Sequence, residues 1–395
     1  MEPEYRRLAV IAGSLALVVQ VAAMSSLASA ETVKPAGTTR GFVITKFLQP
    51  QNFDLYKGDE DCPDGYSEGL GEVALKRMPP GPQKDEALKA TRGGVAVAMK
   101  QPVDQCINPT AHEMPPLKSV KGAFARGMNL DGGNADVEPD SATTCAHPSF
   151  VSPNGERGID NQFYRAVGCT HAYREKVPYG GGYFEQNFQG ARKDGEMTML
   201  IEVTGVQDDK NDDDVEVGFY SSEEATLFDS QGAAIPNNSY TAMSAPKYRA
   251  VAHGRIKDGI LTTDPVDIRA YFKWVLKHED DVYYYIRGAR LRLELAPNGE
   301  AKGMLGGYWD VDMAYKLLFT RGLTKGDGSG AQMLAAGFGY TCPSAYGALH
   351  SLADGYKDPT TGKCTGISTV FDVAAIPAFV ILDGDQAATA TDQKR

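Results

Sequence analysis

Apolar and polar residues alternate at every second position in several segments in the middle of the chain, and this pattern constrains the fold more than any other feature. In one segment, Ile268, Ala270 and Phe272 alternate with Asp267 and Arg269. A β-strand directs successive side chains to opposite faces, whereas a helix would repeat its apolar residues at a longer period. We therefore predict strands in the segments 197–203, 215–219, 266–277 and 289–295.

Turn sequences next to these segments indicate antiparallel hairpins. Asp258-Gly259 separates two short runs of this kind, and Pro297-Asn298-Gly299 follows the run that ends at Leu295. Both are typical of tight hairpin turns. Antiparallel strands without intervening helices are typical of a β-sandwich or jelly roll. We therefore expect a mainly β fold with an antiparallel β-sandwich or jelly-roll-like core.

Helix signals appear only after this β-rich part. Asp310 and Thr369 stand at helix-capping positions, and Pro343 suits the first turn of a helix. The residues before the core are interrupted by Pro and Gly and predict an irregular, disulfide-stapled region packed on it. We expect a signal peptide at 1–30, this irregular region at 31–125, the β core at 126–309, a small C-terminal helical cap at 310–382 and a disordered tail at 383–395.

The N-terminus has the pattern of a secretory signal peptide. Arg6 and Arg7 precede an apolar run from residue 8 to residue 24, and the small residues Ala28 and Ala30 suit a signal peptidase. An uncleaved membrane anchor is the alternative, because the run is close to the length that spans a bilayer. We expect cleavage, export to the periplasm or the extracellular space, and no membrane span afterwards.

Charge and motifs exclude several classes of protein. The formal net charge is −11 at pH 7. An acidic chain without a cluster of Lys and Arg repels phosphate backbones, so we expect no nucleic-acid partner. The sequence contains no zinc-protease, nucleophile-elbow, phosphate-loop or haem-attachment motif. We therefore expect no organic cofactor.

Six cysteines follow the predicted signal peptide, and an even number in an exported protein predicts three disulfides. Six cysteines allow fifteen connectivities. Because neighbours in sequence close short loops, we expect the pairs Cys62–Cys106, Cys145–Cys169 and Cys342–Cys364.

Two Cys-x-His triplets, at Cys145-Ala-His147 and Cys169-Thr-His171, raise the question of a metal site. Two cysteines and two histidines would suit zinc or copper. In an oxidising compartment, however, the sulfurs favour a disulfide flanked by two histidines. A third interpretation keeps the disulfide and lets His147 and His171 converge as a metal-binding or acid–base pair.

Calcium is the metal that the acidic loops favour. Calcium takes oxygen ligands from carboxylates, amides and carbonyls, and glycine lets the chain curl round the ion. Solvated acidic turns are the alternative, and they are also the interpretation we give to Asp209 and Asp213 in a second acidic turn. The predicted metal ligands are Asp131, Asn134, Asp136 and Asp160.

A ligand-binding loop is predicted at residues 179–188, where consecutive glycines lie between aromatic residues. Such rings stack on sugars or apolar ligands, although they also fold inward to cover the edge of a core. The predicted ligand-binding residues are Tyr179, Tyr183, Phe184 and Phe188.

These features support three functional hypotheses. The first is an exported non-catalytic binding protein for a carbohydrate, a small molecule or another envelope ligand, with calcium-stabilised loops. The second is an extracellular polysaccharide hydrolase or lyase that uses Glu156, Asp160 and His171. The third is a structural component of the cell envelope.

Overall fold

The structure is a computed structural model that describes residues 37–50, 57–65, 67, 79–91, 103–114, 118–133, 142–170, 173, 190–272, 283–320 and 342–382. The predicted signal peptide, the predicted disordered tail and the aromatic loop 179–188 lie outside these residues.

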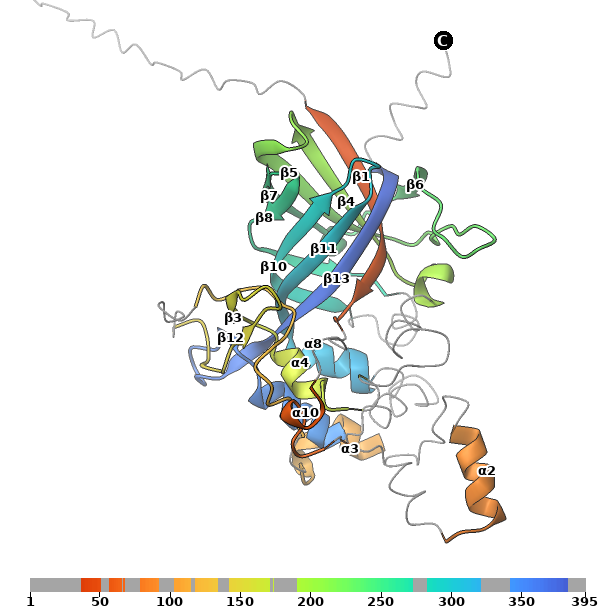
Figure 1. Ribbon diagram of the computed structural model, residues 1–395, viewed down its shortest axis with the longest axis vertical. Coiled ribbons are helices and arrows are strands. Elements are labelled where there is room, and N and C mark those ends of the chain that lie inside the picture. Colours follow the sequence, from red (N-terminus) through yellow and green to blue (C-terminus); the bar gives the residue numbers. More distant parts are fainter. Residues whose placement is uncertain are drawn as a thin grey trace, which may run out of the picture. The chain divides into compact units, whose positions relative to one another are not determined.

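Eight antiparallel strands form a closed barrel (Figure 1). Each of the eight strands pairs with the next of the eight along the chain. The first, β1, also pairs with the last, β13, and this pairing closes the sheet. In it, Phe42 lies opposite Pro377 and Leu48 lies opposite Asp372. The eight strands are β1 (Thr38–Leu48), β4 (Thr198–Val206), β5 (Asn211–Ser222), β7 (Arg249–Lys257), β8 (Ile260–Thr263), β10 (Tyr284–Leu295), β11 (Ala301–Asp310) and β13 (Cys364–Ile381).

The predicted sandwich is therefore wrong in architecture, although the mainly β class is confirmed. The two strands that close the barrel come from regions where the sequence predicts an irregular segment and a helical cap. Thr369, a predicted helix cap, lies inside β13. Its local capping signal is overridden because β13 forms ladders with β1 on one side and β11 on the other.

Side chains fill the inside of the barrel. The predicted alternation is confirmed in β10, where Leu291 and Leu293 are buried and Arg292 between them is exposed. Aromatic rings pack at one level of this core: Phe47 stacks on Phe371 with centroids 4.1 Å apart. Barrels of this size are commonly filled in this way.

Among the described residues, one narrow hollow lies at the wall of the barrel. It lies between β5, β7 and β9 (Val266–Ala270), and it measures about 210 Å³ with open solvent included. Tyr220, Tyr248 and Arg269 are among its lining residues.

A second, smaller core lies on the outer face of β1 and β4. The short strand β6 (Asn238–Thr241) pairs in parallel with the end of β13. Tyr240 and Ala378 from these two strands pack on Val43 and Leu200, and all four are buried. The C-terminal end of β13 is thereby held against the wall of the barrel.

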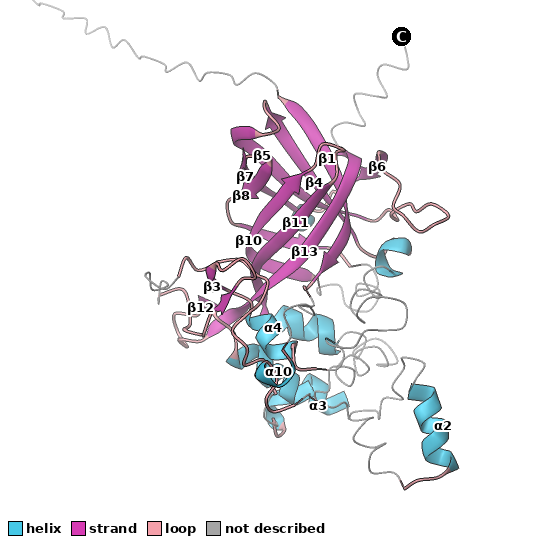
Figure 2. Ribbon diagram, viewed as in Figure 1, coloured by secondary structure: helices cyan, strands magenta, loops and turns pink. Residues whose placement is uncertain are grey.

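Helices and short strands form a lobe at one end of the barrel, where α4, α8 and α10 lie together (Figure 1) and where Figure 2 shows helices beside the strands of the barrel. Asp310 caps α8 through its side chain, which confirms the helix predicted there. None of the helices that the structure describes is long and apolar enough to cross a membrane. The elements of the lobe are α3 (Val103–Ile107), β2 (Phe150–Val151), β3 (Arg157–Ile159), α4 (Gln162–Val167), α8 (Val311–Tyr315), the π-helix η4 (Lys316–Thr320), α10 (Cys342–Ser351) and β12 (Gly355–Lys357), with the 3₁₀ turns η1 (Gly58–Glu60) and η2 (Pro109–Ala111). A further helix, α2, spans Pro82–Thr91.

All six cysteines form disulfides, as expected, but every predicted pair is wrong. The disulfides are Cys62–Cys169, Cys106–Cys342 and Cys145–Cys364, with sequence separations of 107, 236 and 219 residues. The lobe is assembled from distant segments, so proximity in sequence does not identify the partners. No thiol remains for a Cys₂His₂ metal site, which rules that interpretation out. Three disulfides suggest an oxidising, exported environment.

Candidate functional site

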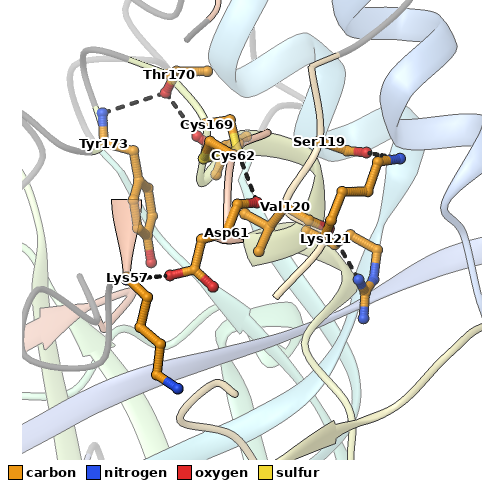
Figure 3. The surroundings of a disulfide bond; sticks show 11 residues. Lys57, Asp61, Cys62, Ser119, Val120, Lys121, Cys169, Thr170 and Tyr173 are labelled. Atoms are coloured by element: carbon orange, nitrogen blue, oxygen red, sulfur yellow. Dashed lines mark hydrogen bonds between the residues drawn. A yellow bond between two sulfur atoms is a disulfide. The ribbon is translucent and has the colours of Figure 1, made fainter. Parts of the chain in front are cut away.

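The disulfide Cys62–Cys169 joins the start of the lobe to α4 and its following turn (Figure 3). Asp61 lies beside it and ties two further segments together. Its carboxylate accepts a hydrogen bond from the amide of Lys57 at 2.8 Å, and its carbonyl accepts one from the amide of Lys121 at 2.8 Å. These contacts give the second Cys-x-His triplet a structural role at Cys169. Its histidine, His171, lies outside the described residues.

The first triplet is also part of the lobe's framework. Cys145 is bonded to Cys364 at the start of β13, and its amide donates to the carbonyl of Asp354 at 2.9 Å. The Nε2 atom of His147 donates to the carbonyl of Ala353 at 3.1 Å. Burial lowers the pKa of His147, so the neutral imidazole is favoured.

Asp131 and Asp160, two of the predicted calcium ligands, lie close together. Asp160 is only 5 % exposed, and one of its oxygens accepts hydrogen bonds from the amides of Leu130 at 2.7 Å and Asp131 at 3.2 Å. Burial, and secondly the charge of Asp131, raises the pKa of Asp160 to about 7. Asn134 and Asp136 lie outside the described residues.

The described residues contain no group of three or more histidines, cysteines or carboxylates arranged for a metal ion. Glu156, a predicted catalytic residue, is exposed just before β3. Its backbone amide donates a hydrogen bond to the hydroxyl of Ser152 at 3.0 Å. Asp160 follows the same strand but is buried. No contact among the described residues joins Glu156 to Asp160.

A second buried carboxylate, Asp354, was not singled out by the sequence. It is 7 % exposed and accepts a hydrogen bond from the amide of Ser368 on β13 at 2.7 Å. Burial raises its pKa to about 8, and the charge of Asp160 contributes to this shift. We call Asp160 and Asp354 the buried carboxylate pair. Tyr308 on β11 faces both, and burial together with their charges raises its pKa.

A carboxyl group that titrates near neutrality is suited to general acid–base chemistry. The buried carboxylate pair, however, is directed at backbone amides of the lobe and of β13 and is almost fully covered. A polymer cannot reach it in this arrangement. The hydrogen bonds of the pair therefore join segments of the lobe to one another and to β13.

The outer face of β9 and β10 presents half-buried aromatic and cationic side chains. Arg269 on β9 lies directly opposite Tyr285 on β10, and its guanidinium carbon is 4.2 Å from the centroid of the tyrosine ring. The hydroxyl of Tyr285 donates to Asp267 at 2.8 Å. Burial, and then this hydrogen bond, raises the pKa of Tyr285 to about 12, so the phenol remains a neutral donor.

A β-bulge extends this surface along β10. The register of β10 shifts between Arg287 and Arg290, and Gly288 within the shift has a φ of +55°. The amide of Gly288 donates to Asp267 at 2.9 Å, which fixes the bulge. Bulges commonly redirect side chains near functional sites.

The bulge brings Arg287 over the ring of Tyr356 from β12, with the guanidinium carbon 4.3 Å from the centroid. Arg287 also donates to the hydroxyl of Thr365 at 3.0 Å and pairs with Asp310 at 3.4 Å. Tyr356 is 39 % exposed and has a φ of +56°, a strained conformation for a tyrosine. Such strain is often found at functional sites.

Lys247 continues the surface on the other side. It lies in the 3₁₀ turn η3 (Pro246–Tyr248), and its Nζ atom is 5.1 Å from the ring centroid of Tyr248 and 5.6 Å from that of Tyr283. The rings of Tyr283 and Tyr285 are 6.2 Å apart. We call the whole surface the tyrosine–arginine strip, which consists of Lys247, Arg269, Tyr283, Tyr285, Arg287 and Tyr356.

The strip was missed at the sequence level, although part of its signal is present. Tyr285 and Arg287 alternate along β10, and Tyr283 precedes the strand at the same spacing, so the rule that identified the core also predicts a shared face for them. Tyr356 carries no such signal, because its place beside Arg287 depends on the pairing of β12 with β13.

Comparison with protein-family models, with curated proteins and with solved structures finds no match to this chain. The case for a function therefore rests on the geometry of the strip.

Proposed function

We propose that this protein is an exported, non-catalytic carbohydrate-binding protein and that the tyrosine–arginine strip is its binding surface. The observation that carries the proposal is the pair of stacked contacts Arg269–Tyr285 and Arg287–Tyr356 on the outer face of the barrel. The three disulfides support the exported location.

Tyrosine suits a sugar ligand because it offers an apolar ring for the C–H face of the sugar and a hydroxyl for its polar edge. Tyr285 is held by Asp267 and Arg269, so little side-chain entropy remains to be lost on binding. Strands also position binding residues more rigidly than loops do. Arg269 and Arg287 each cover one face of these rings, so a linear sugar chain lying along β10 would contact Tyr285 and Tyr356 in turn through their remaining faces and edges.

Calcium remains part of the proposal for the loop that contains Asp131. The carboxylates of Asp131 and Asp160 repel each other, as the raised pKa of Asp160 indicates. A cation between them would relieve this repulsion and would fix the loop beside β11.

The binding proposal is tested by titrating the mature protein with a panel of soluble polysaccharides. Tyr285→Ala and Tyr356→Ala should each weaken binding to the best ligand by about three- to tenfold, because each removes a stacking ring. Phe379→Ala is the matched control: it removes an exposed aromatic ring, 61 % accessible, on the far part of β13. Equal loss in all three variants, or no loss in either tyrosine variant, would contradict the proposal.

A hydrolase or lyase is the second candidate: the raised pKa values of the buried carboxylate pair suit acid–base chemistry, whereas the burial of both groups argues against access by a polymer. The same polysaccharide panel distinguishes the two. Release of reducing ends that is lost in Asp160→Asn would support an enzyme, whereas binding without turnover would support the proposal above.

A further inference from the structure

We propose that the tyrosine–arginine strip selects sugar chains that carry carboxylates, such as chains of uronic acids, over neutral chains. This inference rests on the proposed carbohydrate-binding function and adds the chemical class of the ligand. The selecting residues are Arg269 and Lys247.

Both cations are without an acidic partner among the residues that the structure describes. Some other basic residues of the barrel wall are paired with carboxylates: Arg255 lies 2.8 Å from Asp264, and Lys46 lies 3.2 Å from Asp372. Arg269 and Lys247 instead lie beside tyrosine rings, and within the described part of the chain neither of them forms an ion pair. Unpaired positive charge in a chain of net charge −11 marks a place for an anion.

The contact with Tyr285 uses no side-chain hydrogen-bond donor of Arg269, and no such donor of Arg269 is engaged elsewhere among the described residues. A guanidinium that lies flat on a ring uses its π face for that contact and keeps its N–H groups in the plane, where they reach a carboxylate in a bidentate manner. The neighbouring ring of Tyr285 also reduces the hydration of the guanidinium. Arg269 is therefore positioned before the ligand arrives.

The spacing of the groups fits an acidic sugar better than an isolated anion. Tyr283 lies between Lys247 and Tyr285, with its centroid 5.6 Å from the Nζ atom and 6.2 Å from the ring of Tyr285. A sugar ring stacked on Tyr283 or Tyr285 would thus direct a carboxylate to either cation. Asp267, two residues before Arg269, is the acidic residue beside the strip. Its two carboxylate oxygens accept hydrogen bonds from the hydroxyl of Tyr285 and the amide of Gly288.

The test compares short oligomers of galacturonate with the same oligomers as methyl esters, so that only the charge differs. The wild-type protein should bind the acidic oligomers at least about tenfold more tightly, and added salt should reduce this preference. Arg269→Gln and Lys247→Gln should each weaken binding of the acidic oligomers about three- to tenfold and should leave the esters unaffected.

Arg292→Gln is the matched control, because it removes the same charge from an exposed position on the outer face of β10, beyond the strip. It should change binding less than twofold. Equal effects of Arg269→Gln and Arg292→Gln would show general charge attraction and would overturn the inference.

The outcomes separate this inference from the function on which it rests. Equal affinity for acids and esters, with loss in Tyr285→Ala, would overturn carboxylate selection alone. Binding of neither oligomer would overturn it together with its ligand class, while neutral polysaccharides from the panel would still test the carbohydrate function.

Discussion

Arg269 and Tyr285 occupy directly opposite positions on β9 and β10, and the guanidinium of one covers the ring of the other at 4.2 Å. Cross-strand neighbours of this kind are fixed by the register of the sheet. The barrel therefore does more than enclose a core, because its register also assembles the half-buried outer surface that we propose binds sugars.

Gly288→Ala should weaken sugar binding as well as stability. A Cβ atom at this position would lie 2.8 Å from the hydroxyl of Tyr356 and would meet the strain of a positive φ. We expect a loss of about 1–2 kcal/mol of unfolding free energy and a shift of Tyr356 away from Arg287. Chemical denaturation and ligand titration measure the two effects.

Gly362→Ala is the control for backbone strain alone, because its φ is +69° and nothing lies near the added Cβ atom. It should destabilise without affecting binding. Equal binding by both glycine variants and wild type would contradict the role given to Tyr356.

The buried carboxylate pair predicts a stability that falls as the pH rises from about 4 to 8. The pKa values of Asp160 and Asp354 are raised to about 7 and about 8, so the folded chain holds protons that the unfolded chain releases in this range. Each group that remains protonated in the folded state contributes a slope of about 1.4 kcal/mol per pH unit. His147 acts in the opposite direction below its usual pKa, because burial favours its neutral form.

Asp160→Asn and Asp354→Asn isolate this effect, because asparagine keeps the oxygen that accepts the backbone hydrogen bonds. Thermal unfolding measured at several pH values should show a flatter profile in each variant than in the wild type. Parallel profiles in all three proteins would refute the assignment.

The disulfide connectivity gives a third prediction. Peptide mapping of the unreduced protein should recover Cys62 with Cys169, Cys106 with Cys342 and Cys145 with Cys364. Removal of one bridge, as in the double variant Cys106→Ser/Cys342→Ser, should cost about 2–5 kcal/mol of stability because it frees a long loop in the unfolded chain. Recovery of pairs that are adjacent in sequence would contradict the structure of the lobe.

Calcium binding by the loop at Asp131 is a fourth prediction. Millimolar calcium should raise the melting temperature of the wild-type protein, and a chelator should reverse the change. Asp131→Asn should abolish the effect, whereas Asp213→Asn, in an acidic turn that we interpret as solvated, should retain it. An identical response to calcium in both variants would exclude the site.

The strands that alternate clearly could be predicted from sequence. Leu291 and Leu293 point inward as expected, and the turns at Asp258-Gly259 and Pro297-Asn298-Gly299 join the strands as expected. These features depend on residues close in sequence, for which the period of the side chains is a sufficient guide.

Closure of the barrel could not be predicted in this way, because the pairing of Phe42 with Pro377 joins the two ends of the described chain. No local pattern specifies such a partner, and the same holds for the bond between Cys106 and Cys342. The candidate site could be predicted from sequence only in part, for the same reason. Tyr285 shares a strand with Arg287, but Tyr356 comes from another part of the chain to contact Arg287.

Hydrogen–deuterium exchange of the mature protein, with and without its best polysaccharide ligand, tests the central claim most directly. The account predicts slower exchange in 266–270, 283–289 and 355–357, the segments that carry most of the strip, with the rest of the described chain unchanged. Protection confined to other segments, such as 227–239 beside β6, would place the ligand elsewhere and contradict the proposed binding surface.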